Sequence, residues 1–246
     1  MRRVQRMALD AKAGKYLLEK QSDANTKYAA KTLKPDAHWK SARQTKTMKR
    51  VLVCLQNMMG PRQRCMYCVD SHGCDIEHFQ PKASFSKWMY RWNNLLLCCT
   101  QCGRLKGSKF PLFNSKPLLL DPSKEEPWKY LDFDPTTGNI TARFDILSNA
   151  FQIKGEETVI TLQLDRREAL AVGYQQTYKK LNQRISLFLQ TPTPPQILIY
   201  DLIEHDEHGL LGWFFKGNGQ SEPILIHLKT QYPSVWKACV RAFKFR

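Results

Sequence analysis

The chain has 246 residues, of which 42% are hydrophobic, enough to bury a core in one elaborated domain or in a small central domain with two flanks. Its formal net charge is +16 and its pI is near 9.6. Such an excess of Lys and Arg favours a polyanionic partner such as nucleic acid, and simple solubility is the alternative. No apolar run is long enough to span a bilayer, which argues against a membrane protein.

Eight cysteines would suit disulfides in a secreted protein. Residues 1–9 are basic, however, and no apolar segment follows them, so the sequence shows no secretory signal peptide. We therefore expect a reducing compartment, where paired cysteines bind metal more often than each other. Cys54, Cys74 and Cys239 stand outside the pairs described below and are expected to be structural thiols.

Residues 1–62 form a basic region that is expected to be helical. The first fifty residues hold 14 Lys or Arg against 4 Asp or Glu. Pro35 is expected to divide two helices, and the second, at residues 36–59, has apolar residues at helical spacing. This region is either an arm that binds phosphates beside an active site or a solvated, lysine-rich face.

Residues 63–120 contain two C-x-x-C pairs, Cys65 with Cys68 and Cys99 with Cys102. One such pair is weak evidence, but two pairs around an insert of 30 residues have the spacing of a structural zinc site with four thiolate ligands. Cys98 is an adjacent rival for Cys99, but only Cys99 has the C-x-x-C spacing to Cys102. Four buried thiols without metal are the alternative.

The insert carries groups that suit phosphodiester hydrolysis, which needs an activated water and a cation on the phosphate oxygens. Residues 75–79 are predicted as a short strand that contains Glu77 and His78, and residues 92–97 as an antiparallel strand that contains Asn94. A histidine accepts a proton near neutral pH, and a carboxylate beside it can bind Mg²⁺.

These motifs resemble the HNH endonucleases. The runs IEHFQPK at residues 76–82 and WNNLLLCCTQCGRLKG at residues 92–107 look like the HNH nuclease subunit of Septu anti-phage defence systems, which is also the effector of some retrons. PLLLDPSKEEPWKYLDF, at residues 117–133, and TVITLQLDRREAL, at residues 158–170, also look like that family. The similarity covers roughly residues 64–180.

The resemblance implies an α+β fold with a zinc-stapled ββα-metal core, flanked by N-terminal and C-terminal helices. It also implies a bacterial cytoplasmic complex with an ABC-like ATPase. In retron versions, a reverse transcriptase with its RNA–DNA product belongs to the complex and keeps it inactive until infection.

Individual roles follow from the same resemblance. His78 matches the general base, Glu77 a ligand of the catalytic metal, and Asn94 the residue that orients the histidine through the backbone. Enzymes of this type usually have Asn or His directly after the last zinc cysteine, where this chain has Gly103. Because glycine has no donor atom, Glu77, Asp75, water and substrate phosphate are expected to hold Mg²⁺ or another divalent cation alone.

Four basic residues surround these motifs and are predicted to contact the phosphates that flank the scissile bond: Lys82, Arg104, Lys106 and Lys109. Ordinary surface charge is the alternative. A different set, Trp88, Tyr90 and Trp92, is spaced by two, as on one strand face, and is predicted to pack in the core and not to stack on bases.

Residues 121–246 are predicted to be mostly helical and to bind a partner. Residues 121–160 are acidic, with a hairpin strand expected at residues 139–146, and the longest helical pattern covers residues 156–190. Further helices are expected at residues 196–204 and 222–245. His205, Asp206 and His208 match no strong metal motif and are predicted to lie in a polar turn.

Together these observations predict a metal-dependent nuclease that cuts DNA or RNA, tRNA included, as the toxic effector of a defence complex gated by an ATPase. The alternative is a catalytically inactive zinc module that binds nucleic acid or a partner. Gly103 favours the inactive module, and the combination of Glu77, His78 and Asn94 favours the enzyme.

Overall fold

The computed structural model describes residues 1–244, which divide into two compact units. We call Gln5–Met66 with Ser71–Ser115 the N-terminal unit, and Met1–Val4 with Tyr67–Asp70 and Lys116–Arg246 the C-terminal unit. Residues 5–62 of the basic region therefore share a unit with most of the cysteine segment, whereas residues 1–4 belong to the C-terminal unit.

Three helices open the N-terminal unit: α1 (Ala11–Ala29), α2 (Pro35–Arg43) and α3 (Lys46–Met58). Asp10 caps α1 by accepting a hydrogen bond from the Ala13 amide, 3.0 Å away. The single helix predicted at residues 36–59 is wrong, because Thr45 lies between α2 and α3 with an extended backbone. Its hydroxyl accepts from the Met48 amide and starts a new helix.

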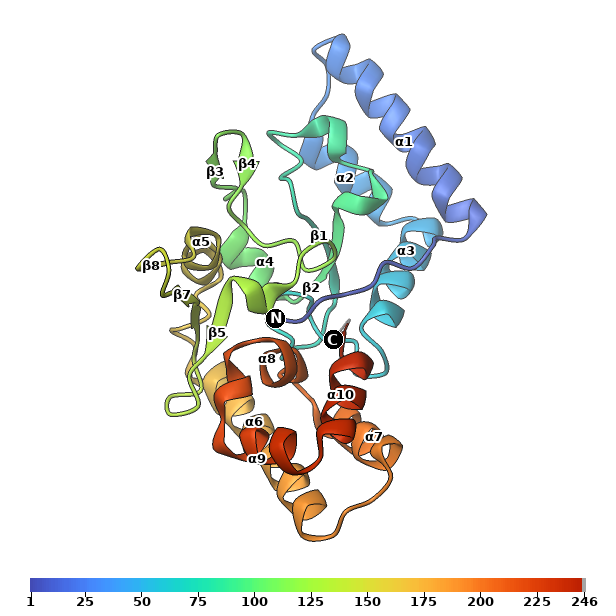
Figure 1. Ribbon diagram of the computed structural model, residues 1–246. Coiled ribbons are helices and arrows are strands. Elements are labelled where there is room, and N and C mark those ends of the chain that lie inside the picture. Colours follow the sequence, from blue (N-terminus) through green and yellow to red (C-terminus); the bar gives the residue numbers. More distant parts are fainter. Residues whose placement is uncertain (245–246) are drawn as a thin grey trace. The chain divides into compact units, whose positions relative to one another are not determined.

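A strand pair followed by a short helix forms the centre of this unit (Figure 1). Strands β1 (Asp75–His78) and β2 (Leu95–Cys98) are antiparallel, with Glu77 opposite Leu96. All of β2 is buried, and α3 packs against it. Helix α4 (Thr100–Lys106) follows β2 and reaches β1 through its last residue.

The chain between β1 and β2 contains two 3₁₀ turns, η1 (Ser86–Trp88) and η2 (Trp92–Asn94), and strand β3 (Leu112–Phe113) follows α4. The strand predicted at residues 92–97 therefore begins later than expected, at Leu95. Trp88 and Tyr90 do not share a strand face: Trp88 is 43% exposed and Tyr90 is buried. The prediction that Trp88 packs in the core is wrong.

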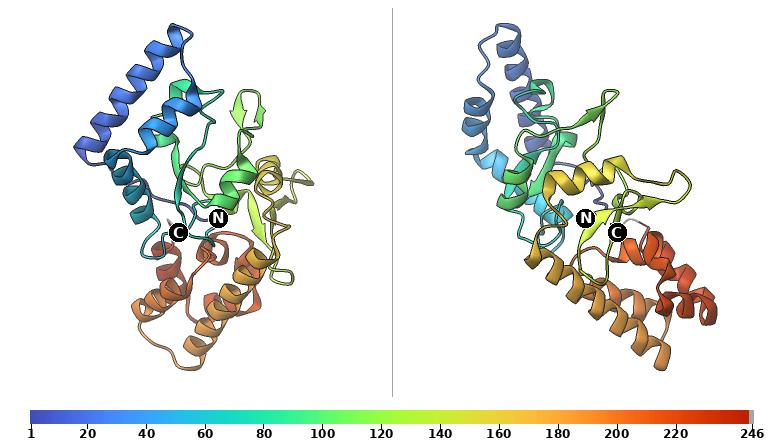
Figure 2. Two further views of the ribbon diagram at one scale, coloured as in Figure 1. Left: turned by 180° about the vertical axis from the view of Figure 1, so that it is seen from behind. Right: turned by 90° about the vertical axis from the view of Figure 1, so that its left-hand side faces the viewer.

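Short strands open the main segment of the C-terminal unit: β4 (Lys116–Pro117), β5 (Leu131–Phe133), β6 (Ile140–Ala142), β7 (Phe144–Asp145) and β8 (Ala150–Phe151), with the 3₁₀ turn η3 (Pro127–Lys129) before β5. Strands β5 and β6 pair antiparallel, as do β7 and β8. Helix α5 packs on β6 (Figure 2).

Helices make up the rest of this unit: α5 (Ile153–Leu162), α6 (Glu168–Gln190), α7 (Pro195–His205), α8 (Leu211–Lys216), α9 (Pro223–Gln231) and α10 (Pro233–Ala242), with the 3₁₀ turn η4 (Asn218–Ser221). The helix predicted at residues 156–190 is interrupted, because Gln163 adopts a left-handed conformation with φ of 49°. The helix predicted at residues 222–245 ends at Gln231, and α10 begins at Pro233. Residues 245 and 246 lie outside the described part of the chain.

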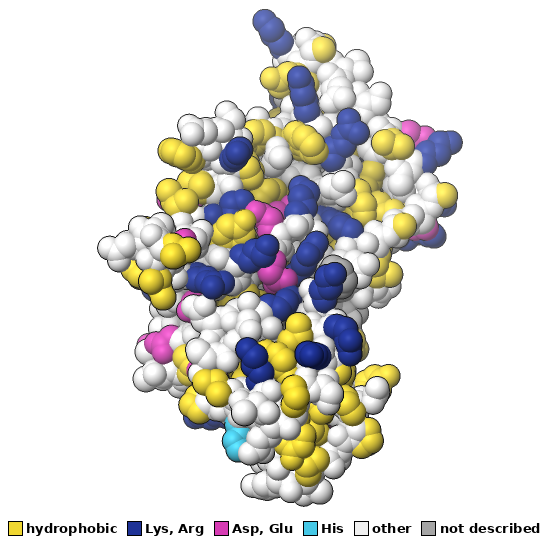
Figure 3. Space-filling view, viewed as in Figure 1, with side chains coloured by type: hydrophobic (Ala, Val, Ile, Leu, Met, Phe, Trp, Pro, Cys, Tyr) yellow, Lys and Arg dark blue, Asp and Glu magenta, His cyan; other side chains and the backbone are white. Residues whose placement is uncertain are grey.

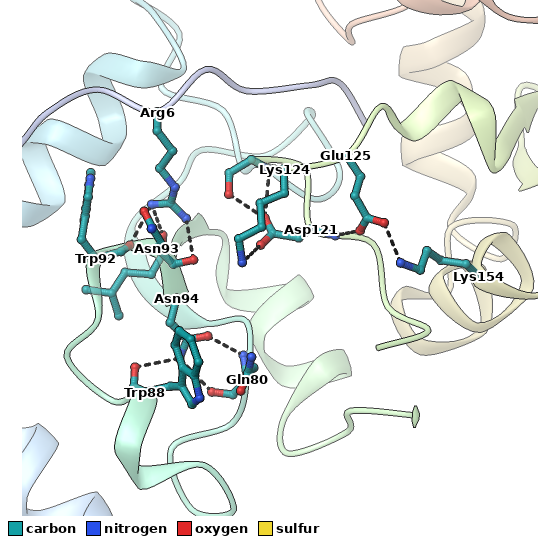
Figure 4. A network of polar contacts seen from close by, with 12 residues as sticks. Arg6, Gln80, Trp88, Trp92, Asn93, Asn94, Asp121, Lys124, Glu125 and Lys154 are labelled. Atoms are coloured by element: carbon teal, nitrogen blue, oxygen red, sulfur yellow. Dashed lines mark hydrogen bonds and ion pairs between the residues drawn. The ribbon is translucent and has the colours of Figure 1, made fainter. Parts of the chain in front are cut away.

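Acidic residues of the stretch at residues 121–160 form ion pairs and hydrogen bonds within the C-terminal unit (Figure 4). Lys154 Nζ donates to Glu125 at 2.6 Å, and Lys124 pairs with Asp121 at 3.0 Å. The carboxylate of Asp132 accepts from Trp213 at 2.6 Å. Several of its negative charges are therefore paired within the fold, which accounts for them without a partner.

Positive charge is widespread on the surface. Figure 3 shows Lys and Arg side chains over much of the face that it presents, with fewer Asp and Glu side chains there. In the part of the chain that the structure describes, we find no helix with the length and apolar character needed to cross a membrane.

Candidate active site and metal centre

The four cysteines of the two C-x-x-C pairs come together. The Sγ atoms of Cys65, Cys68, Cys99 and Cys102 all lie within 4.8 Å of one another. The first pair lies on a tight turn, in which the Cys65 amide donates to the Ser71 carbonyl at 2.8 Å. The second pair starts α4, where Cys99 Sγ accepts from the Cys102 amide at 3.4 Å.

The surroundings of this cluster fit a structural zinc ion. All four thiols are at most 4% exposed, and four sulfur donors from two such pairs are the usual ligand set of structural zinc. Val69, next to the cluster, has a positive φ of 52°, an unusual conformation for a β-branched residue. A metal bound by Cys68 would offset that strain. Cys98 does not belong to the cluster, as the spacing predicted.

Glu77 lies beside an open pocket on the N-terminal unit, which Asp75 and Gly103 also line. Residues two apart on a strand point to the same face, which explains why Asp75 and Glu77 share it. Asp75 accepts from Arg43 Nε at 3.1 Å and keeps 66% of its side chain exposed. A Cβ atom at Gly103, in the middle of α4, would lie 3.7 Å from Glu77 Oε2, so this oxygen faces α4.

Lys106 does not occupy the position predicted for it. We expected a phosphate contact at the surface, but its side chain is fully buried. Its ammonium group donates to Glu77 Oε1 at 2.9 Å and to the His78 carbonyl at 2.7 Å. Burial raises the pKa of Glu77 above its usual value, and the Lys106 ammonium opposes that rise. Lys106 therefore positions Glu77 from within the fold.

Replacing Lys106 with methionine is expected to destabilise the protein by about 2 kcal/mol or more, because the Glu77 carboxylate and the His78 carbonyl lose a buried donor. Urea unfolding of Lys106→Met against wild type measures this loss. The double variant Lys106→Met with Glu77→Gln is expected to recover part of it, since the unpaired charge is gone. Equal unfolding midpoints for Lys106→Met and wild type would contradict the assigned pairing.

His78 is buried at 5% exposure and has a defined ring orientation. Its Nε2 lies 3.0 Å from the Met89 carbonyl. Because a carbonyl only accepts, we assign the proton to Nε2, which leaves the lone pair on Nδ1. The ring packs edge-on against Trp39, with centroids 4.2 Å apart. Burial, and then the nearby Lys82 ammonium, lowers the pKa of His78 to about 3, so the ring is neutral at pH 7.

Asn94 fixes the backbone on both sides of that hydrogen bond (Figure 4). Its Nδ2 donates to the carbonyls of Gln80 and Trp88, each at 3.0 Å. Its Oδ1 accepts from the Gln80 amide at 2.7 Å. Gln80 follows the histidine by two residues, and Trp88 precedes Met89. The side chain of Asn94 therefore ties the segment after His78 to the segment that holds the His78 ring.

The other predicted phosphate ligands lie in three different environments. Lys82 pairs with Asp36 at 2.9 Å. Arg104 is exposed and lines the same pocket as Glu77. Lys109 is exposed after the end of α4 but does not line that pocket. Arg104 is thus the member of the predicted set that shares an open surface with Glu77.

Sequence reasoning missed two residues at this site. Arg43, from α2, lines the pocket and binds Asp75, and Trp39, from the same helix, covers the His78 ring. No local spacing connects α2 with a strand more than thirty residues later. The one available signal was the separation of four between Trp39 and Arg43, which places both on one side of a helix.

The histidines near the end of α7 have separate partners. His205 pairs with Asp201. His208 contacts Thr177 at 2.7 Å and Asp70 at 3.1 Å within the C-terminal unit. Among residues 1–244, the four-cysteine cluster is the one group of three or more metal-binding side chains that lie close together.

Comparison with known proteins points to anti-phage Septu systems. The Septu protein PtuB of Bacillus thuringiensis is 25% identical to this chain over 112 residues, which are 44% of this chain and 38% of PtuB. The chain is similar to a Septu protein. The match supports the Septu link that the motifs indicate, although it spans less than half of PtuB. No family model matches the chain.

Proposed function

We propose that this chain is a metal-dependent nuclease of the HNH type that hydrolyses phosphodiester bonds of DNA or RNA in an anti-phage defence complex. The observation that carries the proposal is the His78 arrangement. A neutral imidazole, with its proton held at Nε2 by the Met89 carbonyl, presents the Nδ1 lone pair as a base. Asn94 supports the proposal because it fixes the backbone around that bond.

In this proposal His78 Nδ1 takes the proton of the attacking water. A phosphodiester anion bound beside the ring favours the protonated form and raises the pKa of His78 towards the working range. Arg43 and Arg104 line the pocket beside Glu77, which His78 does not line, and they offer positive charge to a phosphate that would span this pocket and the His78 side of β1.

Glu77 and Asp75 would hold the catalytic divalent cation, which stabilises negative charge on the phosphate and leaving oxygen when bound. Both residues line the pocket, and Glu77 Oε2 faces Gly103 while Oε1 binds Lys106. Hard carboxylate oxygens suit Mg²⁺, which keeps several waters and tolerates few protein ligands.

Gly103→Asn is expected to lower the Mg²⁺ concentration needed for half-maximal cleavage several-fold, because it adds a donor beside Glu77. A side chain fits there, since an added Cβ atom would lie 3.7 Å from Glu77 Oε2 and 3.8 Å from Cys98 Sγ, which are ordinary contacts. Titration of cleavage with Mg²⁺ measures the effect. Gly103→Ala is the matched control, because it adds the Cβ without a donor. If both variants behave as wild type, Gly103 has no part in metal binding.

The biological setting of the proposal comes from the Septu similarity. As the resemblance implies, the chain would act as the toxic subunit beside an ABC-like ATPase, and in a retron setting beside a reverse transcriptase with its RNA–DNA product. The partner would release nuclease activity on infection. The substrate would be DNA or RNA, with tRNA as one candidate.

Expression with the neighbouring ATPase subunit tests this proposal in cells. Wild type and His78→Ala strains are triggered by phage infection, and total DNA and total RNA are sequenced. We expect wild type to fragment one pool and His78→Ala to fragment neither, which would name the substrate. Equal protection by both strains, with both pools intact, would contradict the proposal.

A second candidate, a catalytically inactive zinc module, has two observations in its favour. Gly103 offers no metal donor, and Lys106 already neutralises Glu77. Under that function the four-cysteine cluster would still bind zinc and the chain would still bind its partner, but His78 variants would protect as well as wild type.

A further inference from the structure

A second open pocket lies on the N-terminal unit, between α1 and the segment that connects β1 with β2. Leu17 and Leu18 of α1 line one side, and Trp88, Tyr90 and Trp92 line the other. Trp88 is 43% exposed, and among residues 1–244 the other tryptophans are buried or half-buried. An exposed indole in a pocket that other aromatic and aliphatic side chains also line offers a flat surface on which a ligand ring can stack.

The exposed indole belongs to a rigid segment. Gln21, buried at 3% exposure on α1, donates to the Ser86 carbonyl at 3.0 Å and accepts from the Tyr90 amide at 2.8 Å. Asn94 holds the Trp88 carbonyl between those two points. Hydrogen bonds thus fix the backbone at Ser86, Trp88 and Tyr90. The exposure of the Trp88 ring is therefore a property of an ordered segment.

The charges at this pocket suit an anion. Lys87 and Arg91 line it, and both are exposed. No Asp or Glu is found among the described residues that line it. Arg6 lies over the neighbouring Trp92 ring, 5.0 Å from its centroid. An apolar protein segment would gain nothing from these cations, whereas a nucleotide combines a flat ring with a negative phosphate.

We propose that this pocket binds an unpaired base of a single-stranded nucleic acid segment, with Trp88 stacking on the base and Lys87 and Arg91 contacting the adjoining phosphates. Bases in a duplex are stacked on each other and are not available to Trp88, so the pocket selects single strands or extruded bases. The inference rests on the proposed nuclease function, for which it names the substrate class.

The pocket is connected to the candidate active site through one short segment. Met89, which accepts the hydrogen bond from His78, follows Trp88 directly. The Asn94 side chain that holds the Trp88 carbonyl also holds Gln80, two residues after His78. A strand anchored at Trp88 is therefore bound to the segment that orients the proposed base.

Binding of oligonucleotides to the full chain tests the inference without any cleavage. Fluorescein-labelled dT and rU oligonucleotides of about 12 nucleotides, a length within the usual site size of single-strand binders, are titrated by anisotropy without added divalent cation. We expect Trp88→Leu to weaken binding roughly tenfold, as for the loss of one base–aromatic stack, and Trp88→Phe to bind nearly as wild type. Wild-type tryptophan fluorescence is expected to be quenched by single strands and much less by duplex.

Three controls separate the outcomes. Tyr200→Leu removes an aromatic side chain that is 72% exposed on α7 and is expected to leave affinity unchanged. Lys87→Ala with Arg91→Ala is expected to reduce the dependence of affinity on salt. His78→Gln is expected to bind as wild type, so a failure of the proposed catalysis is distinguishable from a failure of this pocket. The dT and rU arms show which sugar is preferred.

Equal affinity of Trp88→Leu and wild type, with unchanged melting temperature and zinc content, would overturn the inference and leave an apolar protein segment as the occupant. Quenching by duplex as strong as by single strands would overturn it as well.

Discussion

Replacing His78 with glutamine is expected to slow nucleic acid cleavage by a factor of about 100 to 10,000, the usual contribution of a general base. Glutamine keeps an N–H that can donate to the Met89 carbonyl, which His78 Nε2 reaches at 3.0 Å. It has no basic nitrogen to take a proton from water. The rate of cleavage by the purified assembly of this chain and its partner, with Mg²⁺ in excess, measures the effect.

Two controls make this result specific to catalysis. His78→Gln is expected to keep the zinc content of wild type and to bind its partner, because the buried hydrogen bond is preserved. Asn94→Ala is expected to reduce the rate as well, since the carbonyls of Gln80 and Trp88 lose their common donor. Cleavage by His78→Gln at the wild-type rate would remove His78 from the mechanism.

Loss of one zinc ligand is expected to unfold the segment around the candidate site. Cys68→Ser or Cys102→Ser breaks a cluster whose four Sγ atoms lie within 4.8 Å of one another. Zinc binding supplies on the order of 10 kcal/mol of folding free energy in small zinc domains. We therefore expect zinc content to fall from one ion per chain to near zero, and the melting temperature to fall sharply. Elemental analysis and thermal melting measure these two quantities.

Cys74→Ser and Cys98→Ser are matched controls in the same segment. Both thiols lie outside the cluster, Cys74 exposed and Cys98 buried. Both variants are expected to keep one zinc ion per chain. A wild-type protein that carries no zinc, or a Cys102→Ser variant that keeps it, would contradict the assignment of the cluster.

Local spacing was sufficient to predict the cluster and the strand that carries the candidate base. Two C-x-x-C pairs fix four ligands by their sequence separation, and the structure brings those thiols together. The alternation at Glu77 and His78 predicted a strand there, which is observed at Asp75–His78. These features depend on a few neighbouring residues, so the sequence contains enough information for them.

Features that depend on distant contacts were not predictable in this way. The sequence around Lys106 predicts surface charge, but the side chain is buried. Its ammonium group binds Glu77 and the His78 carbonyl, which lie almost thirty residues earlier in the chain. The spacing of Trp88 predicts a core residue, but its ring is exposed, because the hydrogen bonds of Gln21 and Asn94 hold the backbone of residues 86–90 in another conformation than a strand. The break between α2 and α3 depends on the Thr45 hydroxyl, which caps α3. The apolar residues continue at helical spacing on both sides of Thr45, so their pattern alone predicts one helix.

The oxygen chemistry of the cleaved ends tests the central claim most directly. The purified assembly is incubated with total RNA and plasmid DNA in water enriched in ¹⁸O, with and without Mg²⁺, and the new ends are analysed by mass spectrometry. The account predicts Mg²⁺-dependent cleavage in which each new terminal phosphate carries one oxygen from solvent, and loss of those ends in His78→Gln. Ends that carry a 2′,3′-cyclic phosphate, or identical products from His78→Gln, would contradict hydrolysis by a water activated at His78.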